Sequence, residues 1–254
     1  MEDAVLSQFR VWGFHAEKIP ENQREKRPDF LVRDTEGVVY LVELKEKADD
    51  PEKLQRITAK LDADEMHVSI TPVKPRNTMS GIIGDAELQL KSANHYKADH
   101  NLVWLAASGI DHEEKYEQFF ATLYGSTRIW NLDPAEPTKY CYFFRNSSFF
   151  RFRSIIDAAI LTYNESAQLC LNPHSERYAS IKSTGLYNFF VSENACIDPL
   201  QEELDCDAYI ADTDLDRRNE QSIVDYLCKK YKAELMNIDV GYHAFTVGYP
   251  EKET

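Results

Sequence analysis

Residues 27–45 of the chain read RPDFLVRDTEGVVYLVELK, and this stretch decides the fold. Two apolar runs, residues 30–32 and 38–42, flank a polar turn that contains Gly37. A short loop with a glycine in the left-handed conformation is typical of a β-hairpin. If the turn centres on Glu36, then Asp29 and Glu43 face each other across the two strands.

The two opposed carboxylates point to a metal site. Side chains alternate along a strand, so Lys45 lies on the same side as Glu43. At roughly 5 Å and an effective dielectric of about 20, Asp29 and Glu43 repel by on the order of 3 kcal/mol. A divalent cation between them would turn this repulsion into attraction. A solvated hairpin edge is the alternative, but an unpaired charge such as Glu43 is costly in an otherwise apolar strand.

The spacing of these residues resembles a known family. Pro28-Asp29, then thirteen residues, then Glu43-Leu44-Lys45 is similar to the signature of the PD-(D/E)XK nuclease superfamily, the restriction-endonuclease-like phosphodiesterases. The resemblance implies that Asp29 and Glu43, with the backbone carbonyl of Leu44, bind Mg²⁺ or Mn²⁺. It assigns to Lys45 the orientation of the attacking water and the stabilisation of charge at the phosphate.

Many members of this superfamily carry supporting groups outside the signature. Glu17 and Glu21 are the best-placed candidates for a further acid near the first helix. Gln89 and Lys91 are available on a later helix, and Gln89 is the one assigned here, although a Q-x-x-x-Y pattern is absent there. The basic residues expected to contact nucleic acid precede the hairpin or lie in a stiff turn: Arg24, Lys26, Arg27, Lys74 and Arg76.

A second segment also mixes basic and aromatic residues. Arg145, Arg151 and Arg153 interleave with phenylalanines over residues 143–152. Such a segment can form a stacking surface for single-stranded nucleic acid. We favour the simpler interpretation, a pair of strands with phenylalanines in the core and arginines in solvent.

The net charge of −14 constrains nucleic-acid binding, which depends on Lys and Arg. Residues 1–110 contain 15 basic and 19 acidic side chains, so they contribute −4 and the remainder −10. We therefore expect the first half to bind nucleic acid. The acidic second half would serve assembly, through a protein partner or a homo-oligomer.

Hydrophobic periodicity predicts the remaining elements. The predicted helices cover residues 3–12, 51–61, 81–97, 112–124, 155–163 and 219–231. The predicted strands cover residues 67–73, 102–107, 128–132, 140–144, 149–152, 235–240 and 242–248. The resemblance implies an α/β fold with a restriction-endonuclease-like core, a central mixed sheet flanked by helices. The prolines in 131–138 suggest a boundary between a core, 1–133, and an acidic α+β extension, 134–254, either separate from the core or continuous with it.

The sequence lacks the motifs and patterns of several other classes of protein. There is no G-x-x-x-x-G-K phosphate loop, no G-x-G-x-x-G and no G-x-S-x-G motif. Five scattered cysteines without a C-x-x-C pair argue against a disulfide framework and a structural zinc site. No apolar run approaches the roughly 20 residues of a membrane span, and the start is not a signal peptide. We therefore expect a cytoplasmic protein without a membrane partner.

Together these patterns predict a magnesium-dependent nuclease, an endonuclease rather than an exonuclease. DNA is favoured over RNA because it is the commoner substrate of the superfamily, whose members act in restriction, repair, recombination or defence against phage. Two alternatives remain open. One is an RNA endonuclease of the same fold, and the other is a non-catalytic interaction protein that uses its acidic surface.

Overall fold

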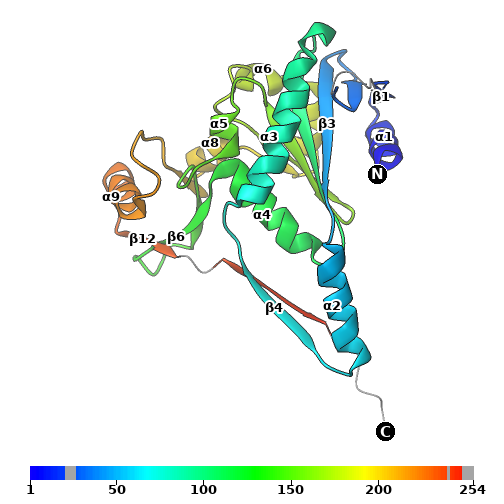
Figure 1. Ribbon diagram of the computed structural model, residues 1–254. Coiled ribbons are helices and arrows are strands. Elements are labelled where there is room, and N and C mark those ends of the chain that lie inside the picture. The colour runs from blue at the N-terminus through cyan, green and yellow to red at the C-terminus, as the bar shows by residue number, and fades with distance from the viewer. Residues whose placement is uncertain (21–26, 239–240, 248–254) are drawn as a thin grey trace.

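The computed structural model describes residues 1–20, 27–238 and 241–247, and a mixed seven-stranded sheet forms its centre (Figure 1). In spatial order the strands are β1 (His15–Lys18), β2 (Phe30–Arg33), β3 (Val39–Lys47), β5 (His100–Ala107), β8 (Ala158–Tyr163), β9 (Ser166–Leu171) and β10 (Cys196–Ile197). Strands β1 to β3 are antiparallel, whereas β3, β5 and β8 are parallel. The predicted α/β class, with a central mixed sheet flanked by helices, is confirmed.

Helices cover both faces of this sheet. One face carries α3 (Asn77–Ser92), α4 (His112–Tyr124) and α5 (Ser148–Arg151), and the other carries α1 (Glu2–Val11), α6 (Tyr178–Ile181) and α7 (Gly185–Ser192). Two short elements, a 3₁₀ turn (Asn94–Tyr96) and α8 (Pro199–Leu204), complete this set. Strand β5 is buried on both faces, as its continuous apolar sequence predicted.

The alternation of side chains in β3 positions the candidate site. Leu41 packs in the core beneath α3 and α4, whereas Tyr40 and Val42 pack in the core beneath α1 and α7. Glu43 and Lys45 are two and four residues beyond Leu41, so they lie on the side of α3. Helix α3 places Ile83, Ala86 and Leu90 in the same core, a spacing typical of one helical face.

Two smaller sheets lie outside the central one. The first has the order β11 (Ala208–Ile210), β7 (Lys139–Tyr142), β6 (Thr127–Asn131) and β12 (Leu235–Ile238), and α9 (Glu220–Tyr231) packs on it. The second pairs β4 (His67–Pro72) with β13 (Tyr242–Val247); together with α2 (Pro51–Asp62) it projects from the body as an arm (Figure 1). The predicted strand at 67–73 therefore exists, but outside the central sheet.

Two predicted elements are wrong. Residues 155–163 were expected to be helical, but 158–163 form β8 between β5 and β9. A short apolar run has the same pattern in a buried helix and in a strand buried on both faces, so periodicity could not distinguish them. Residues 149–152 were expected to be a strand, but 148–151 form α5. The Ser147 side chain accepts a hydrogen bond from Phe150 N there, as an N-cap residue does.

The central sheet crosses the boundary suggested near residue 133. Strands β1, β2, β3 and β5 precede it, and β8, β9 and β10 follow it. The smaller sheet likewise combines strands from before and after residue 133, because β6 pairs with β7. Strands from both halves of the chain therefore complete one hydrogen-bonded sheet, and the second half supports the face on which α3 lies.

Candidate functional site

The hairpin has the predicted register, which brings the two acidic residues together. Phe30 pairs with Val42, so Asp29 and Glu43 come opposite each other at the next position. Gly37 has φ +84° and takes the left-handed conformation in the turn. Asp29 lies just before β2, and its Oδ2 accepts a hydrogen bond of 2.7 Å from the backbone N–H of Leu44.

Glu43 is the most unusual residue of the site, because its carboxylate is buried beneath α3. Only 1% of the residue is exposed. Oε1 contacts the ammonium group of Lys45, but the structure provides no hydrogen-bond partner for Oε2 within its described ranges. A buried carboxylate oxygen without a partner loses its hydration without compensation, so a cation, or a proton shared with Asp29, would stabilise it.

Burial shifts the titration of both carboxyl groups. It raises the pKa of Glu43 to about 8, against the opposing hydrogen bond from Lys45, and the charge of Asp29 adds to the rise. Burial also raises the pKa of Asp29, although the Leu44 N–H and the charge of Lys45 act in the opposite direction. The single lysine thus compensates incompletely for two acids.

Gln89, the supporting residue expected from the sequence, contacts Lys45 from α3. Its Oε1 accepts a hydrogen bond of 2.5 Å from Lys45 Nζ. Its Nε2 donates to the carbonyl of Arg27 at 3.2 Å. Gln89 therefore connects the ammonium group to the segment that carries Asp29, and it holds Lys45 beside Glu43.

The backbone supplies one more oxygen in a suitable place. The N–H and C=O groups of one strand residue point toward the same neighbouring strand. Because the N–H of Leu44 donates to Asp29, the Leu44 carbonyl also faces the side of Asp29. The Leu44 carbonyl therefore points toward the strand end that carries Asp29, opposite Glu43.

These donors suit a hard divalent cation. Mg²⁺ binds through one or two carboxylates and keeps several waters, so it does not need a full set of protein ligands. No group of three or more His, Cys, Asp or Glu side chains occurs in residues 1–20, 27–238 and 241–247 that could hold a metal alone. The site fits Mg²⁺ or Mn²⁺ better than zinc, which takes three or four protein ligands.

The other predicted site residues lie elsewhere. Glu17 is exposed on the edge strand β1, where its carboxylate lies 2.8 Å from His15 Nε2. Glu21, Arg24 and Lys26 fall outside the described residues. Arg27 adjoins the site through its carbonyl.

Lys74 and Arg76 lie at the start of α3, far from the carboxylates. Gln89 is thirteen residues beyond Arg76, or about 20 Å along a helix at roughly 1.5 Å per residue. Both basic residues line a cavity that also includes Arg145, Arg151 and Arg153. No local pattern predicted that these two segments meet, because they are about seventy residues apart in the chain.

Comparison with known proteins identifies no relative: no family model matches the chain, and no curated protein or solved structure shows significant similarity to it.

Among the helices that the structure describes, no helix has the length and apolar character of a membrane span. All five cysteines have free thiols, and two of them, Cys141 and Cys170, are buried.

Proposed function

We propose that this protein is a metal-dependent nuclease that hydrolyses phosphodiester bonds, with DNA as the favoured substrate, and that Asp29, Glu43 and Lys45 carry the reaction. The main support for this proposal is the environment of Glu43. It is buried against a second carboxyl group, and one of its oxygens has no hydrogen-bond partner in the described parts of the chain. Such an arrangement is unfavourable by itself, and a cation at this position would stabilise it.

Each residue has a distinct role in the proposed reaction. Asp29, Glu43 and the Leu44 carbonyl would hold Mg²⁺ or Mn²⁺. The bound ion would polarise the phosphate and supply a water of lowered pKa. Lys45 would orient the attacking water and stabilise the charge that develops on the phosphate, because its ammonium group is fixed beside the carboxylates. Gln89 would position Lys45 without touching the substrate.

The arrangement of elements supports the resemblance to PD-(D/E)XK nucleases. Along the chain a helix (α1), an antiparallel set of strands (β1 to β3), a further helix (α3) and a buried parallel strand (β5) occur in this order, with α2 and β4 between β3 and α3. The Asp and Glu-x-Lys positions lie at the end of the hairpin, under α3. A non-catalytic interaction protein would have no physical reason to keep two opposed carboxyl groups and a lysine in this position.

Thermal unfolding with and without Mg²⁺ or Mn²⁺ tests the site directly. The ion should raise Tm, because only the folded hairpin brings both carboxylates together. Glu43→Gln should abolish the rise while leaving the protein folded, and Glu46→Gln, on the exposed part of the same strand, should not. The parallel assay is metal-dependent nicking of plasmid DNA and cleavage of a structured RNA, which also distinguishes the two substrates.

The pH dependence gives an independent check. The pKa of Glu43 rises from 4.5 to about 8 on folding, so the folded chain binds more protons than the unfolded chain between these values. Without metal, stability should therefore fall as the pH rises from about 5 to 8, and Glu43→Gln should flatten this fall. The Tm rise caused by Mg²⁺ should grow over the same range, because the ion displaces the proton. An equal metal response in wild type and Glu43→Gln would place the ion elsewhere and remove the proposal's main support.

A further inference from the structure

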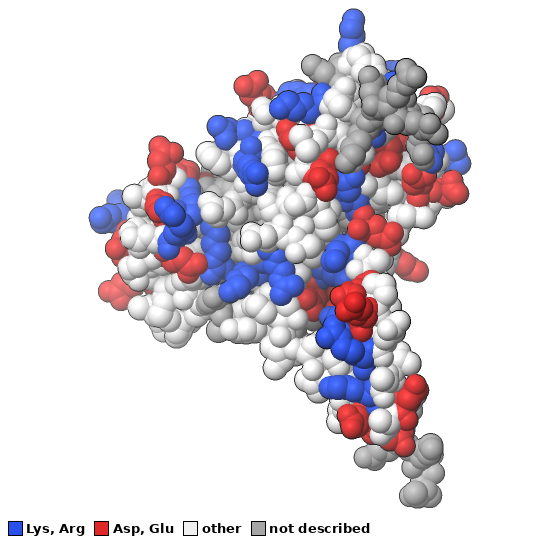
Figure 2. Space-filling view, viewed as in Figure 1, with Lys and Arg blue, Asp and Glu red and all other residues white. Residues whose placement is uncertain are grey.

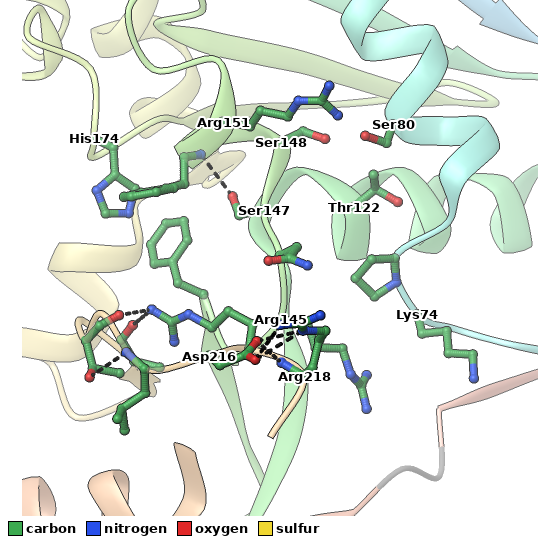
Figure 3. A pocket seen from close by; sticks show the side chains of 18 of the residues that line it. Lys74, Ser80, Thr122, Arg145, Ser147, Ser148, Arg151, His174, Asp216 and Arg218 are labelled. Carbon is green, nitrogen blue, oxygen red and sulfur yellow. Dashed lines mark hydrogen bonds and ion pairs between the residues drawn. The ribbon is translucent and has the colours of Figure 1, made fainter. Parts of the chain in front are cut away.

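A large basic cavity lies at the opposite end of α3 from the carboxylates. Its volume is about 1160 Å³, and its walls come from the start of α3, from α4, from the segment around α5 and from the loop before α9 (Figure 3). In Figure 2, Lys and Arg side chains gather across the region between α9 and the start of α3. None of the residues assigned to the nuclease site lines this cavity.

The charge of the cavity opposes that of the whole chain. Seven Lys or Arg residues line it against four Asp or Glu residues, in a protein with a net charge of −14. A cleft in which one sign of charge is in excess attracts ligands of the other sign. The ligand of this cavity should therefore be an anion.

Part of the positive charge is already neutralised. Arg145 Nε lies 2.7 Å from Glu220, and Arg218 forms a 2.8 Å ion pair with Asp216. Arg217 donates hydrogen bonds to backbone carbonyls, including that of Ala211 at 2.9 Å. These contacts order the loop before α9 and leave the other cations to act on a ligand.

Four exposed cations have no acidic partner: no carboxylate of the described residues forms an ion pair with Lys74, Arg76, Arg151 or Arg153. They come from two segments that converge on the cavity, before α3 and around α5. Exposed cations that converge without forming ion pairs repel one another, and phosphates between them would remove that repulsion.

The polar groups between these cations also suit phosphate. Ser80 on α3 and Ser148 at the start of α5 lie between Arg151 and Thr122 in the close view (Figure 3). Helix α3 begins at the cavity with no acidic residue in its first turn and no side-chain cap, so its first N–H groups add to the positive potential. Hydroxyls and backbone N–H groups are common phosphate contacts in nucleic-acid complexes.

One aromatic ring in the cavity remains half exposed. Phe150 has a relative exposure of 49%, and the Arg153 guanidinium lies 4.4 Å from its ring centroid. His174 meets the same ring edge-on at 5.0 Å. A phenylalanine exposed among arginines offers a stacking surface for a nucleobase, and a duplex would not present its bases there.

We propose that this cavity binds a single-stranded segment of nucleic acid, with phosphates at Lys74, Arg76 and Arg151 and a base stacked at Phe150. That the bound strand is the substrate rests on the proposed function; the binding itself does not. The cavity and the carboxylates are separated by about 20 Å of α3, so a strand held here would enter or leave the nuclease site unpaired.

Fluorescence anisotropy in EDTA, where no metal-dependent cleavage occurs, tests the binding. The probes are labelled oligo(dT), the same strand in a duplex, and a labelled mononucleotide. Oligo(dT) should bind most tightly. Arg76→Gln/Arg151→Gln should weaken its binding at least about tenfold and reduce the slope of log K against log salt by about 1.4, since each phosphate contact to a single strand contributes about 0.7. Phe150→Leu should weaken the single strand about tenfold and the duplex much less.

The matched control is Lys91→Gln/Lys229→Gln, which makes the same charge change at two exposed residues outside the cavity. Equal losses in both double variants would overturn the proposal, because only net charge would matter. Preference for the duplex would also overturn it, and a mononucleotide that binds as tightly as oligo(dT) would assign the cavity to free nucleotides.

Glu43→Gln separates this proposal from the nuclease proposal. It should bind oligo(dT) in EDTA like the wild type. If strand binding depends on Arg76 and Arg151 but no metal-dependent cleavage exists, only the nuclease proposal fails. If cleavage depends on Glu43 but the double variant binds normally, only the cavity proposal fails.

Discussion

Two buried clusters of lysines and carboxylates lie against the same face of the central sheet, and they differ in their balance. In the first, Lys115 on α4 contacts both Asp49 and Asp111, and Lys53 on α2 also contacts Asp111. In the second, Lys45 alone lies between Glu43 and Gln89, with Asp29 nearby. The first cluster matches two cations to two anions, and the second has one cation for two.

The Lys115 cluster is satisfied throughout. Lys115 also donates to the carbonyl of Ser108 at 2.6 Å, and Asp49 accepts the N–H of Ile110 at 2.8 Å. Burial alone would raise the pKa of Asp111, but the hydrogen bonds that it accepts from Lys115 and Lys53 hold it well below the usual value. This cluster fastens α2 and α4 to the end of β5.

The Lys45 cluster shows the opposite behaviour: burial raises the pKa of both of its carboxyl groups, and one oxygen of Glu43 is left without a partner among the described residues. Charges that serve only stability are paired or neutralised, because an unpaired buried charge opposes folding. The contrast is the one that we expect between a structural ion cluster and the metal site proposed at Asp29 and Glu43.

The largest expected effect is a loss of stability when the Lys115 cluster is broken. Lys115→Met should destabilise the protein by about 3–5 kcal/mol, because two buried carboxylates lose their shared cation. The fall in Tm should be roughly 10 °C in a chain of this size. The Tm rise caused by Mg²⁺ should persist. If Lys91→Met, at an exposed position, lowers the stability equally, the Lys115 cluster is not structural.

The next effect concerns activity and not stability. Lys45→Ala should reduce metal-dependent cleavage by about 10²–10³-fold while leaving the metal-induced Tm rise nearly intact. Lys45→Arg should restore little, since a planar guanidinium cannot take the place of a compact ammonium group. Lys47→Ala is the control, two residues further along the same face of β3. Unchanged cleavage in Lys45→Ala would show that the hairpin is not the active site.

The smallest effect tests the positioning of Lys45. Gln89→Ala removes the acceptor at 2.5 Å from Lys45 Nζ and should lower kcat about tenfold with little change in KM or Tm. Leu88→Ala, at an exposed neighbouring position on α3, should leave kcat unchanged. If Gln89→Ala raises KM and leaves kcat unaltered, Gln89 contacts the substrate and does not position Lys45.

Local patterns predicted the elements whose signals are local. The hairpin register followed from the position of Gly37 and the two apolar runs, and α4 has the predicted bounds, His112–Tyr124. The choice of Gln89 as a supporting residue also agrees with its contact to Lys45. Patterns failed where burial on all sides removes periodicity, as in β8.

The sequence by itself determined the hairpin, the pairing of Asp29 with Glu43 and the side on which Lys45 lies, because strand alternation and turn geometry depend only on neighbouring residues. Only the tertiary structure decided which charges are satisfied. Whether a carboxylate finds a lysine depends on helices far along the chain: α4 supplies Lys115 to Asp49, and α3 supplies only Gln89 to the group around Glu43. The basic cavity arises in the same way, where the turn before α3 meets the segment around α5. Such long-range contacts follow from how the core packs, and no local pattern encodes them.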